Sequence, residues 1–403
     1  MSSIIAGSFL DPAQDTPALK RQFHCRCGKP VYFRNSLCVS CDTQLGFEPG
    51  AGELLALSPG AQADTWIRWQ EAPADAAAPA WRRCSNFHTA AVCNWLIPAD
   101  PQAMPRDAQG RPLAERTLCP ACAVNRVIPD LSGPKRAQQW GRIELAKRRL
   151  FSQLIAMGLP VASRVDQDPQ RGVAFDFLAD TPGAARVLTG HDEGQITLNI
   201  AEADDAQREQ AREAMHEPYR TLLGHLRHEI GHYYWDRLVA GTPWLDDFRS
   251  LFGDERADYA QALQRHYQQG PAPDWPLHYI SAYAASHPWE DWAETWAHYL
   301  HIVDTMATVL GFGLAVQDTE LSWDAFPPAS LYRPEADDAA PFLAAINDWV
   351  RLTGVLNELS RSMGVPDFYP FVMSLDVVRK LQFVHLVVKQ AREGGGGEAT
   401  LSG

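Results

Sequence analysis

Apolar residues recur at two spacings, which separate a part of the chain that contains strands from a mainly helical part. From Trp140 to Met157 apolar side chains return every three or four residues, which predicts a helix that ends at Gly158. Residues 173–177 and 196–200 alternate between apolar and polar side chains, which predicts two half-buried strands. Helical spacing returns in three later segments, residues 222–238, 343–359 and 375–388. We therefore expect an α+β fold with a small sheet.

Length and charge narrow the class of protein. The 403 residues, 46% of them hydrophobic and 21% charged, are typical of a soluble globular protein with two or three domains. A net charge of -13 argues against a general nucleic-acid binder, whose surface would be basic. No apolar run approaches the roughly 20 residues that cross a membrane, and the N-terminus lacks the order of a secretory signal. We expect a cytoplasmic protein with no membrane partner.

Eight cysteines lie before residue 123, and without an export signal they should stay thiols unless a metal binds them. The first four form two short pairs, Cys25 with Cys27 and Cys38 with Cys41, separated by ten residues. This spacing is typical of a four-cysteine zinc ribbon. Four sulfur ligands leave no coordination position open for a substrate, so the predicted zinc is structural. The ribbon is locally basic, and a protein partner there is a hypothesis.

The other four cysteines are less regular. Cys119 and Cys122 form a third short pair, whereas Cys84 and Cys93 are nine residues apart. The latter two reach the pair only if the intervening chain loops back. We predict a second structural zinc site with these four cysteine ligands, and keep His88 as an alternative ligand.

Residues 224–236 contain the pattern His-Glu-x-x-His inside a predicted helix. His228 and His232 are four residues apart, so their imidazoles point the same way and can share one metal ion. Glu229, one step round the helix, can then reach a water molecule held on that metal. The alternative is a pair of histidines on an ordinary helix.

Two further polar residues flank this pattern. His225 lies one turn before His228, and we expect it beside the site rather than on the metal, because three histidines of one straight helix cannot comfortably reach a single ion. Asp236 lies four residues after His232. It either orients a histidine or caps the neighbouring Arg237, and the sequence does not choose between these interpretations.

A catalytic zinc keeps three protein ligands and one open position, so the pattern needs another ligand. Residues 252–259 and 283–299 both offer carboxylates. In the second stretch Pro288 is well placed to begin a helix, and Glu290 and Glu294 follow on one face. Acidic residues also simply complement a helix dipole, but carboxylates among several tryptophans need a compensating ion. We choose Glu290 as the third ligand and Glu294 as the hydrogen-bond acceptor for a ligand imidazole.

The ribbon cysteines and the runs 220–236 and 287–301 together resemble the gluzincin metallopeptidases. They resemble more closely a family of bacterial zinc-binding metallopeptidases with an N-terminal zinc ribbon, over nearly the whole chain. The second run is also similar to the third-ligand helix of the anthrax lethal factor catalytic domain, where a tyrosine precedes Glu-x-x-x-Glu by seven residues. Tyr283 holds that position, so the resemblance implies that its hydroxyl faces the reacting carbonyl.

The motif and the resemblance predict a zinc metalloendopeptidase that acts on a peptide or protein substrate. A zinc-held water attacks the peptide bond, Glu229 transfers its proton to the leaving nitrogen, and Tyr283 or a histidine stabilises the oxyanion. Residues 194–200 are our candidate for a sheet edge that binds an extended peptide. One alternative is a catalytically silent protein that recruits a partner through its zinc ribbon. Another is a hydrolase or nuclease for non-peptide bonds, which the acidic charge disfavours.

These expectations give a domain plan in which N-terminal zinc-ribbon modules come before a mainly helical, zincin-like metallopeptidase domain with a small sheet. Its parts are a flexible lead at residues 1–20, a zinc ribbon at 21–50, a second cysteine module at 51–130, a metallopeptidase domain at 131–390 and a disordered tail at 391–403.

Overall fold

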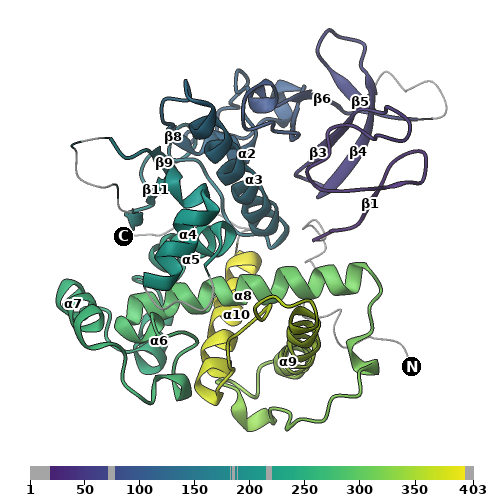
Figure 1. The fold of residues 1–403 in the computed structure, drawn as a ribbon. Coiled ribbons are helices and arrows are strands. Elements are labelled where there is room, and N and C mark those ends of the chain that lie inside the picture. The colour runs from purple at the N-terminus through teal and green to yellow at the C-terminus, as the bar shows by residue number, and fades with distance from the viewer. Residues whose placement is uncertain are drawn as a thin grey trace. The chain divides into compact units, whose positions relative to one another are not determined.

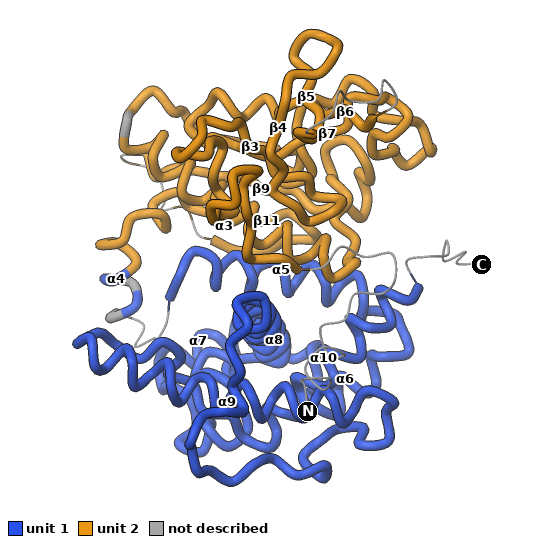
Figure 2. The backbone as a smooth tube through the Cα atoms, turned by 90° about the vertical axis from the view of Figure 1, so that its right-hand side faces the viewer, with its two compact units in different colours: residues 1–13, 209–403 blue, residues 14–208 orange. Residues whose placement is uncertain are grey.

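The computed structural model describes residues 19–394 apart from 71–77, 182, 184–186, 188 and 215–219. Most of the expected lead, and the expected tail after residue 394, therefore lie outside the described residues. The chain divides into one unit of residues 14–208 and a second that continues from residue 209 (Figure 2). The division falls within α4, Asp205–Ala214.

The first unit begins with two antiparallel sheets. A two-stranded sheet pairs β1 with β2, and a five-stranded sheet has the order β3-β4-β5-β6-β7. The strands span Phe23–His24 (β1), Pro30–Val31 (β2), Leu45–Glu48 (β3), Glu53–Pro59 (β4), Trp66–Arg68 (β5), Ala80–Arg83 (β6) and Leu96–Pro98 (β7). Phe47 on β3 contacts the rings of Phe33 and Trp95 at centroid distances of 4.8 and 5.1 Å. This aromatic cluster joins the segment that carries the first cysteines to the larger sheet.

A mixed sheet and a long helix complete the first unit. The strand order is β10-β11-β9-β8, with Asn125–Val127 (β8), Ala174–Leu178 (β9), Gly190–Asp192 (β10) and Gln195–Asn199 (β11). β9 and β11 confirm the two strands predicted from alternation. The short α2, Pro120–Ala123, comes before α3, Pro134–Ala156, which confirms the predicted helix. Gly158 lies beyond its end with φ of 69°, a conformation that favours glycine.

The predicted role of residues 194–200 as a sheet edge is wrong. β11 pairs in parallel with β9 on one side and antiparallel with β10 on the other. Its backbone groups are therefore largely used within the sheet, and a peptide cannot add to it as a new strand. Alternation of apolar side chains reports which face of a strand is buried, but not whether the strand has a neighbour on both sides.

Helices make up the second unit. They span Leu222–Leu238 (α5), Trp244–Phe252 (α6), Tyr259–Gln269 (α7), Pro288–Gly311 (α8), Ala339–Ser362 (α9) and Leu375–Gly394 (α10). α8 packs against α5, α6, α9 and α10 (Figure 1). Short 3-10 turns lie in both units: Ser85–His88 (η1), Pro101–Ala103 (η2) and Ile200–Ala203 (η3) in the first, and Trp275–Leu277 (η4), Ala284–Ser286 (η5), Val316–Asp318 (η6) and Pro328–Ser330 (η7) in the second. A β-rich region followed by a mainly helical region with a small mixed sheet confirms the α+β fold.

α5 and α8 approach closely where the sequence has a glycine. A Cβ atom at Gly231 would lie 3.2 Å from the backbone of Ala293 and from the ring of Trp296. The neighbouring Trp292 donates a hydrogen bond from Nε1 to the Gly231 carbonyl at 2.8 Å. Every residue of α5 from Leu226 to Trp235 is buried. The middle of the helix with the His-Glu-x-x-His pattern is therefore buried, and its two ends are partly exposed.

Buried ion pairs fix α8 to its neighbours. Arg227 on α5 bonds to Asp304 at 2.8 Å, and Lys380 on α10 bonds to Asp291 at 2.6 Å. All four side chains are at most 6% exposed, so removing one partner would leave an uncompensated buried charge. None of the described helices is both long and apolar enough to span a lipid bilayer.

Candidate metal centres

The structure brings the predicted metal ligands together in three separate groups. They are the two sets of four cysteines and the set of His228, His232 and Glu290, and within each set the ligand atoms lie within 4.8 Å of one another. Each cysteine group lies in the first unit, and the histidine and glutamate group lies in the second.

The first cysteine group forms from two tight turns. The Cys25 and Cys41 sulfurs are 3.6 Å apart, and those of Cys27 and Cys38 are 3.8 Å apart. A zinc ion bonded at about 2.3 Å to four sulfurs places them about 3.8 Å from one another. Hydrogen bonds with Thr43 lower the pKa of Cys41 and favour the thiolate that binds metal, whereas burial raises the pKa of Cys25. The arrangement fits a tetrahedral zinc.

The second cysteine group is closed by a pair of strands. Cys84 follows β6 and Cys93 comes shortly before β7, and the antiparallel pairing of these strands brings the two cysteines together. Cys93 Sγ is 3.7 Å from Cys119 Sγ, at the distance expected for zinc ligands. All four cysteines are buried. The group consists of cysteines, and His88 is not part of it.

Charge around the second cysteine group is partly offset by a buried arginine. Four thiolates and one zinc ion carry a net charge of about -2, which is costly in an apolar interior. Arg148 on α3 is 3% exposed and donates to the Ala91 carbonyl at 2.9 Å. Its Nε and Nη1 have no hydrogen-bond partner within the described chain. Burial would lower the pKa of Arg148, but the nearby Cys93 and Glu144, with two further cysteines, raise it. The guanidinium thus stays charged beside the thiolates.

Replacing Arg148 by Met tests this balance. We expect Arg148→Met to lower the free energy of unfolding by about 3 kcal/mol and to speed zinc loss from the second cysteine group, because the charge of the centre loses its counterion. Thermal unfolding and zinc release to a coloured chelator measure the two effects. The control is Arg142→Met on the exposed face of the same helix. Equal zinc release from both variants would contradict the role of Arg148.

The third group joins α5 to α8. Glu290 Oε2 lies 3.0 Å from His228 Nε2 and 3.6 Å from His232 Nε2. Bonds of about 2.0 to 2.1 Å from zinc to nitrogen and oxygen place tetrahedral ligand atoms about 3.3 Å apart. Glu290 is 1% exposed, and its Oε2 accepts no well-oriented hydrogen bond within the described chain. A buried carboxylate oxygen that faces two ring nitrogens in this way fits a metal ion between them.

Local sequence explains how each ligand is placed. Thr221 caps the start of α5 by accepting a hydrogen bond from the Gly224 backbone at 3.0 Å. α8 begins at Pro288, as predicted, and His287 caps it by accepting a hydrogen bond from the Trp289 backbone. Glu290 therefore lies in the first turn of a helix with a fixed start, directly opposite the middle of α5.

Neighbouring residues orient His228. Its Nδ1 donates to Glu294 Oε1 at 2.7 Å, and Ser281 donates to the other oxygen of Glu294 at 2.7 Å. The hydrogen bond at Nδ1 leaves Nε2 to face Glu290, the arrangement that a metal-binding histidine requires. Glu294 thus bonds to one of the candidate ligand imidazoles, whereas Ser281 carries no signal in the sequence.

Two of the remaining predicted residues, His225 and Tyr283, lie beside the site. His225 lies 3.2 Å from Glu229 and outside the ligand group. Burial would raise the pKa of Glu229, but the hydrogen bond with His225 lowers it, so the carboxylate is ionised at neutral pH. The ring of Tyr283 lies 5.8 Å from that of His228. Asp236 is half-buried on α5 and is not a member of the ligand group.

The competing stretch for the third ligand, residues 252–259, has other uses. Asp254 pairs with Arg256, and Glu255 pairs with Arg249. Only Tyr259, at the end of the stretch, reaches the ligands: its hydroxyl donates to Glu290 Oε1 at 2.6 Å. The sequence does not predict this contact, because no motif marks a tyrosine that comes from a separate helix.

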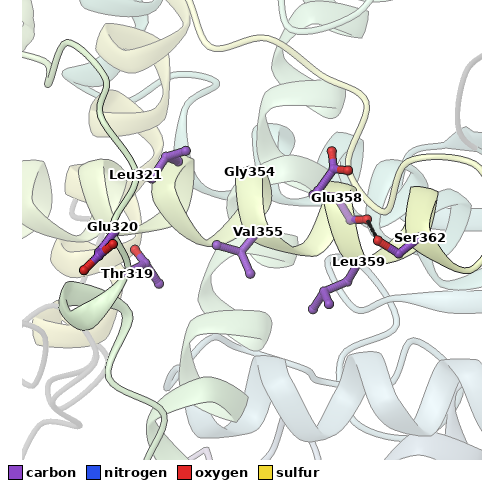
Figure 3. Close-up of a pocket in the computed structure, with 8 residues that line it drawn as sticks. All are labelled: Thr319, Glu320, Leu321, Gly354, Val355, Glu358, Leu359 and Ser362. Carbon is purple, nitrogen blue, oxygen red and sulfur yellow. Dashed lines mark hydrogen bonds between the residues drawn. The ribbon is translucent and has the colours of Figure 1, made fainter.

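A hollow between α9 and residues 319–321 is not part of this site (Figure 3). It has a volume of about 330 Å³ and is lined by apolar side chains such as Leu321, Val355 and Leu359, with Glu320 and Glu358 at its sides. None of its lining residues belongs to the three ligand groups.

Comparisons with known proteins agree with these groups. Residues 136–387 match the family described as "Putative zinc-binding metallo-peptidase", and residues 22–133 match a zinc-ribbon domain. Proteins of Mycobacterium bovis and Mycobacterium tuberculosis, described as uncharacterized, are 41% identical over 372 residues, which cover 92% of this chain and 96% of theirs. No solved structure matches. The likeness to gluzincins and to lethal factor stays a prediction.

Proposed function

The chain belongs to the zinc-binding metallopeptidase family, and from that premise we propose that it is a zinc-dependent endopeptidase that cleaves peptide bonds. One observation carries the proposal: the buried Glu290 of α8 faces His228 and His232 of α5. Two imidazoles and one carboxylate are the ligand set of many catalytic zinc sites, and they leave one position open. The two four-cysteine groups, by contrast, leave no coordination position open for a substrate.

The residues around the site have separate roles in this proposal. A zinc ion held by the three ligands would polarise the scissile carbonyl and make a water molecule more acidic. Glu229, ionised and next to the ligands, accepts the proton of the attacking water and returns it to the leaving nitrogen. Tyr283 donates a hydrogen bond to the developing oxyanion, a role that its ring position beside His228 supports. Glu294 and Ser281 keep the ring of His228 in place.

The substrate and partner expectations follow from the same site. The proposed substrate is a peptide or protein, and the edge of a sheet that would bind it is not β11, because both sides of that strand are paired. A protein partner at the first cysteine module remains a second part of the proposal. The acidic net charge of -13 makes a phosphate backbone an unfavourable substrate.

Metal removal tests the proposal. Zinc-loaded protein should cleave members of a mixture of unstructured peptides, read by mass spectrometry. A strong chelator should abolish cleavage and added zinc should restore it, because the ion activates the water. Cleavage that persists after chelation would contradict the zinc mechanism. A fully loaded protein that cleaves no peptide would instead favour the silent protein that recruits a partner.

A further inference from the structure

Tyr259 lies outside α5 and α8 and forms a hydrogen bond to the metal ligand Glu290. It is the first residue of α7, and its hydroxyl donates to Glu290 Oε1 at 2.6 Å. The other oxygen, Oε2, faces the two histidines at 3.0 and 3.6 Å. The two oxygens of one carboxylate therefore have different partners: one has the tyrosine and the other the metal position.

Three local contacts hold Tyr259 in place. Asp258 caps α7 by accepting a hydrogen bond from the Gln261 backbone at 2.9 Å. His287 Nε2 donates to the Ala257 carbonyl at 3.1 Å, which ties the start of α8 to the residues before α7. The tyrosine ring lies 5.2 Å from the ring of His287. The hydroxyl is thus directed at Glu290 by the backbone of two helix starts.

The exposure of Tyr259 argues against a simple packing role. The residue is 41% exposed, whereas the carboxylate that it contacts belongs to a residue that is 1% exposed. An aromatic residue that served only core packing would stabilise the fold more if it were fully buried. The hydrogen bond to a buried carboxylate, by contrast, uses only the tip of the side chain, and such charge-assisted bonds are among the strong ones.

We propose that Tyr259 is a positioning residue that makes Glu290 bind the metal through Oε2 alone. A carboxylate can bind a metal ion with one oxygen or with both. When Oε1 is held by the tyrosine, it cannot swing onto the metal, and the fourth coordination position stays free for water or substrate. The proposal rests on the same site as the proposed function, but it concerns metal binding and not turnover.

Replacing Tyr259 by Phe removes the hydroxyl and keeps the ring that packs beside His287. The variant should be compared with the parent protein by titrating Co²⁺ into the histidine and glutamate site while both cysteine groups hold zinc. We expect a 10- to 100-fold weaker Co²⁺ affinity, as is usual when a partner of a metal ligand is lost. We also expect weaker visible absorption, because binding through both carboxylate oxygens raises the coordination number of the cobalt.

Tyr267→Phe is the matched control, since Tyr267 lies on the same helix and is 61% exposed. It should leave both the affinity and the spectrum of the cobalt site unchanged. Zinc retained in the cysteine groups and an unchanged far-ultraviolet circular dichroism spectrum report that Tyr259→Phe is folded. An unaltered cobalt spectrum and affinity in Tyr259→Phe would overturn the proposal. Because cobalt binding is read without substrate, failure to find a peptidase activity would leave this result standing.

Discussion

Replacing Glu229 by Gln should lower the rate of peptide cleavage by roughly 10²- to 10⁴-fold while the protein keeps its zinc. Glutamine has nearly the same shape as glutamate, but its neutral amide cannot accept the proton of the attacking water. Glu229 is next to His228 in the chain and outside the ligand group, so its replacement leaves the three metal ligands in place. Steady-state cleavage of the best peptide, together with zinc analysis of the same sample, measures both parts of the prediction.

The control for Glu229→Gln is Glu320→Gln, which makes the same chemical change at an exposed position beside the hollow of α9. That variant should cleave at the parent rate. Loss of zinc in Glu229→Gln would mean that the residue supports the metal site rather than proton transfer. Full activity of a zinc-loaded Glu229→Gln protein would remove Glu229 from the mechanism.

Glu290→Ala should reduce the zinc content from three ions per chain to two and abolish cleavage. The substitution removes the only carboxylate of the third ligand group and leaves His228 and His232 as two ligands from one helix. Two imidazoles bind zinc far more weakly than a three-ligand site, because the ion then depends on water for its remaining coordination. Elemental analysis of purified protein after dialysis gives the count directly.

The cysteine groups provide the internal control for Glu290→Ala. They lie in the first unit, while Glu290 lies in the second, so their two zinc ions should remain. Retention of all three ions after dialysis would exclude Glu290 as the third ligand. Loss of all three would show that the variant had unfolded, and Glu290→Gln, which preserves the side-chain volume, then replaces it in the same assay.

Both experiments depend on residues that the sequence had already placed. His228 and His232 lie four positions apart on one helix, and this spacing makes their rings point the same way. Local periodicity was therefore enough to pair them. The first cysteine group is equally local, since each of its pairs lies in a single turn. Glu290 was harder, but Pro288 marked the start of its helix and two carboxylates followed on one face.

Other features needed the tertiary structure. Cys84 and Cys93 meet only because β6 and β7 pair. The sequence does not show which strands pair with one another. The same limit made the prediction for residues 194–200 wrong, because β10 covers the side of β11 that was expected to be free. Burial of one face was visible in the sequence, and the number of neighbouring strands was not.

What the sequence by itself determined was therefore set within a turn or along one helix: the two cysteine pairs of the ribbon, the paired histidines, the carboxylate beside them and the helix that carries Glu290. Only the tertiary structure decided which oxygen of Glu290 faces the metal position, because that depends on Tyr259 from α7, 31 residues away. Periodicity and spacing constrain side chains on one element, since the backbone geometry is known in advance. The meeting of separate elements is set by packing of the whole unit, which no local pattern records.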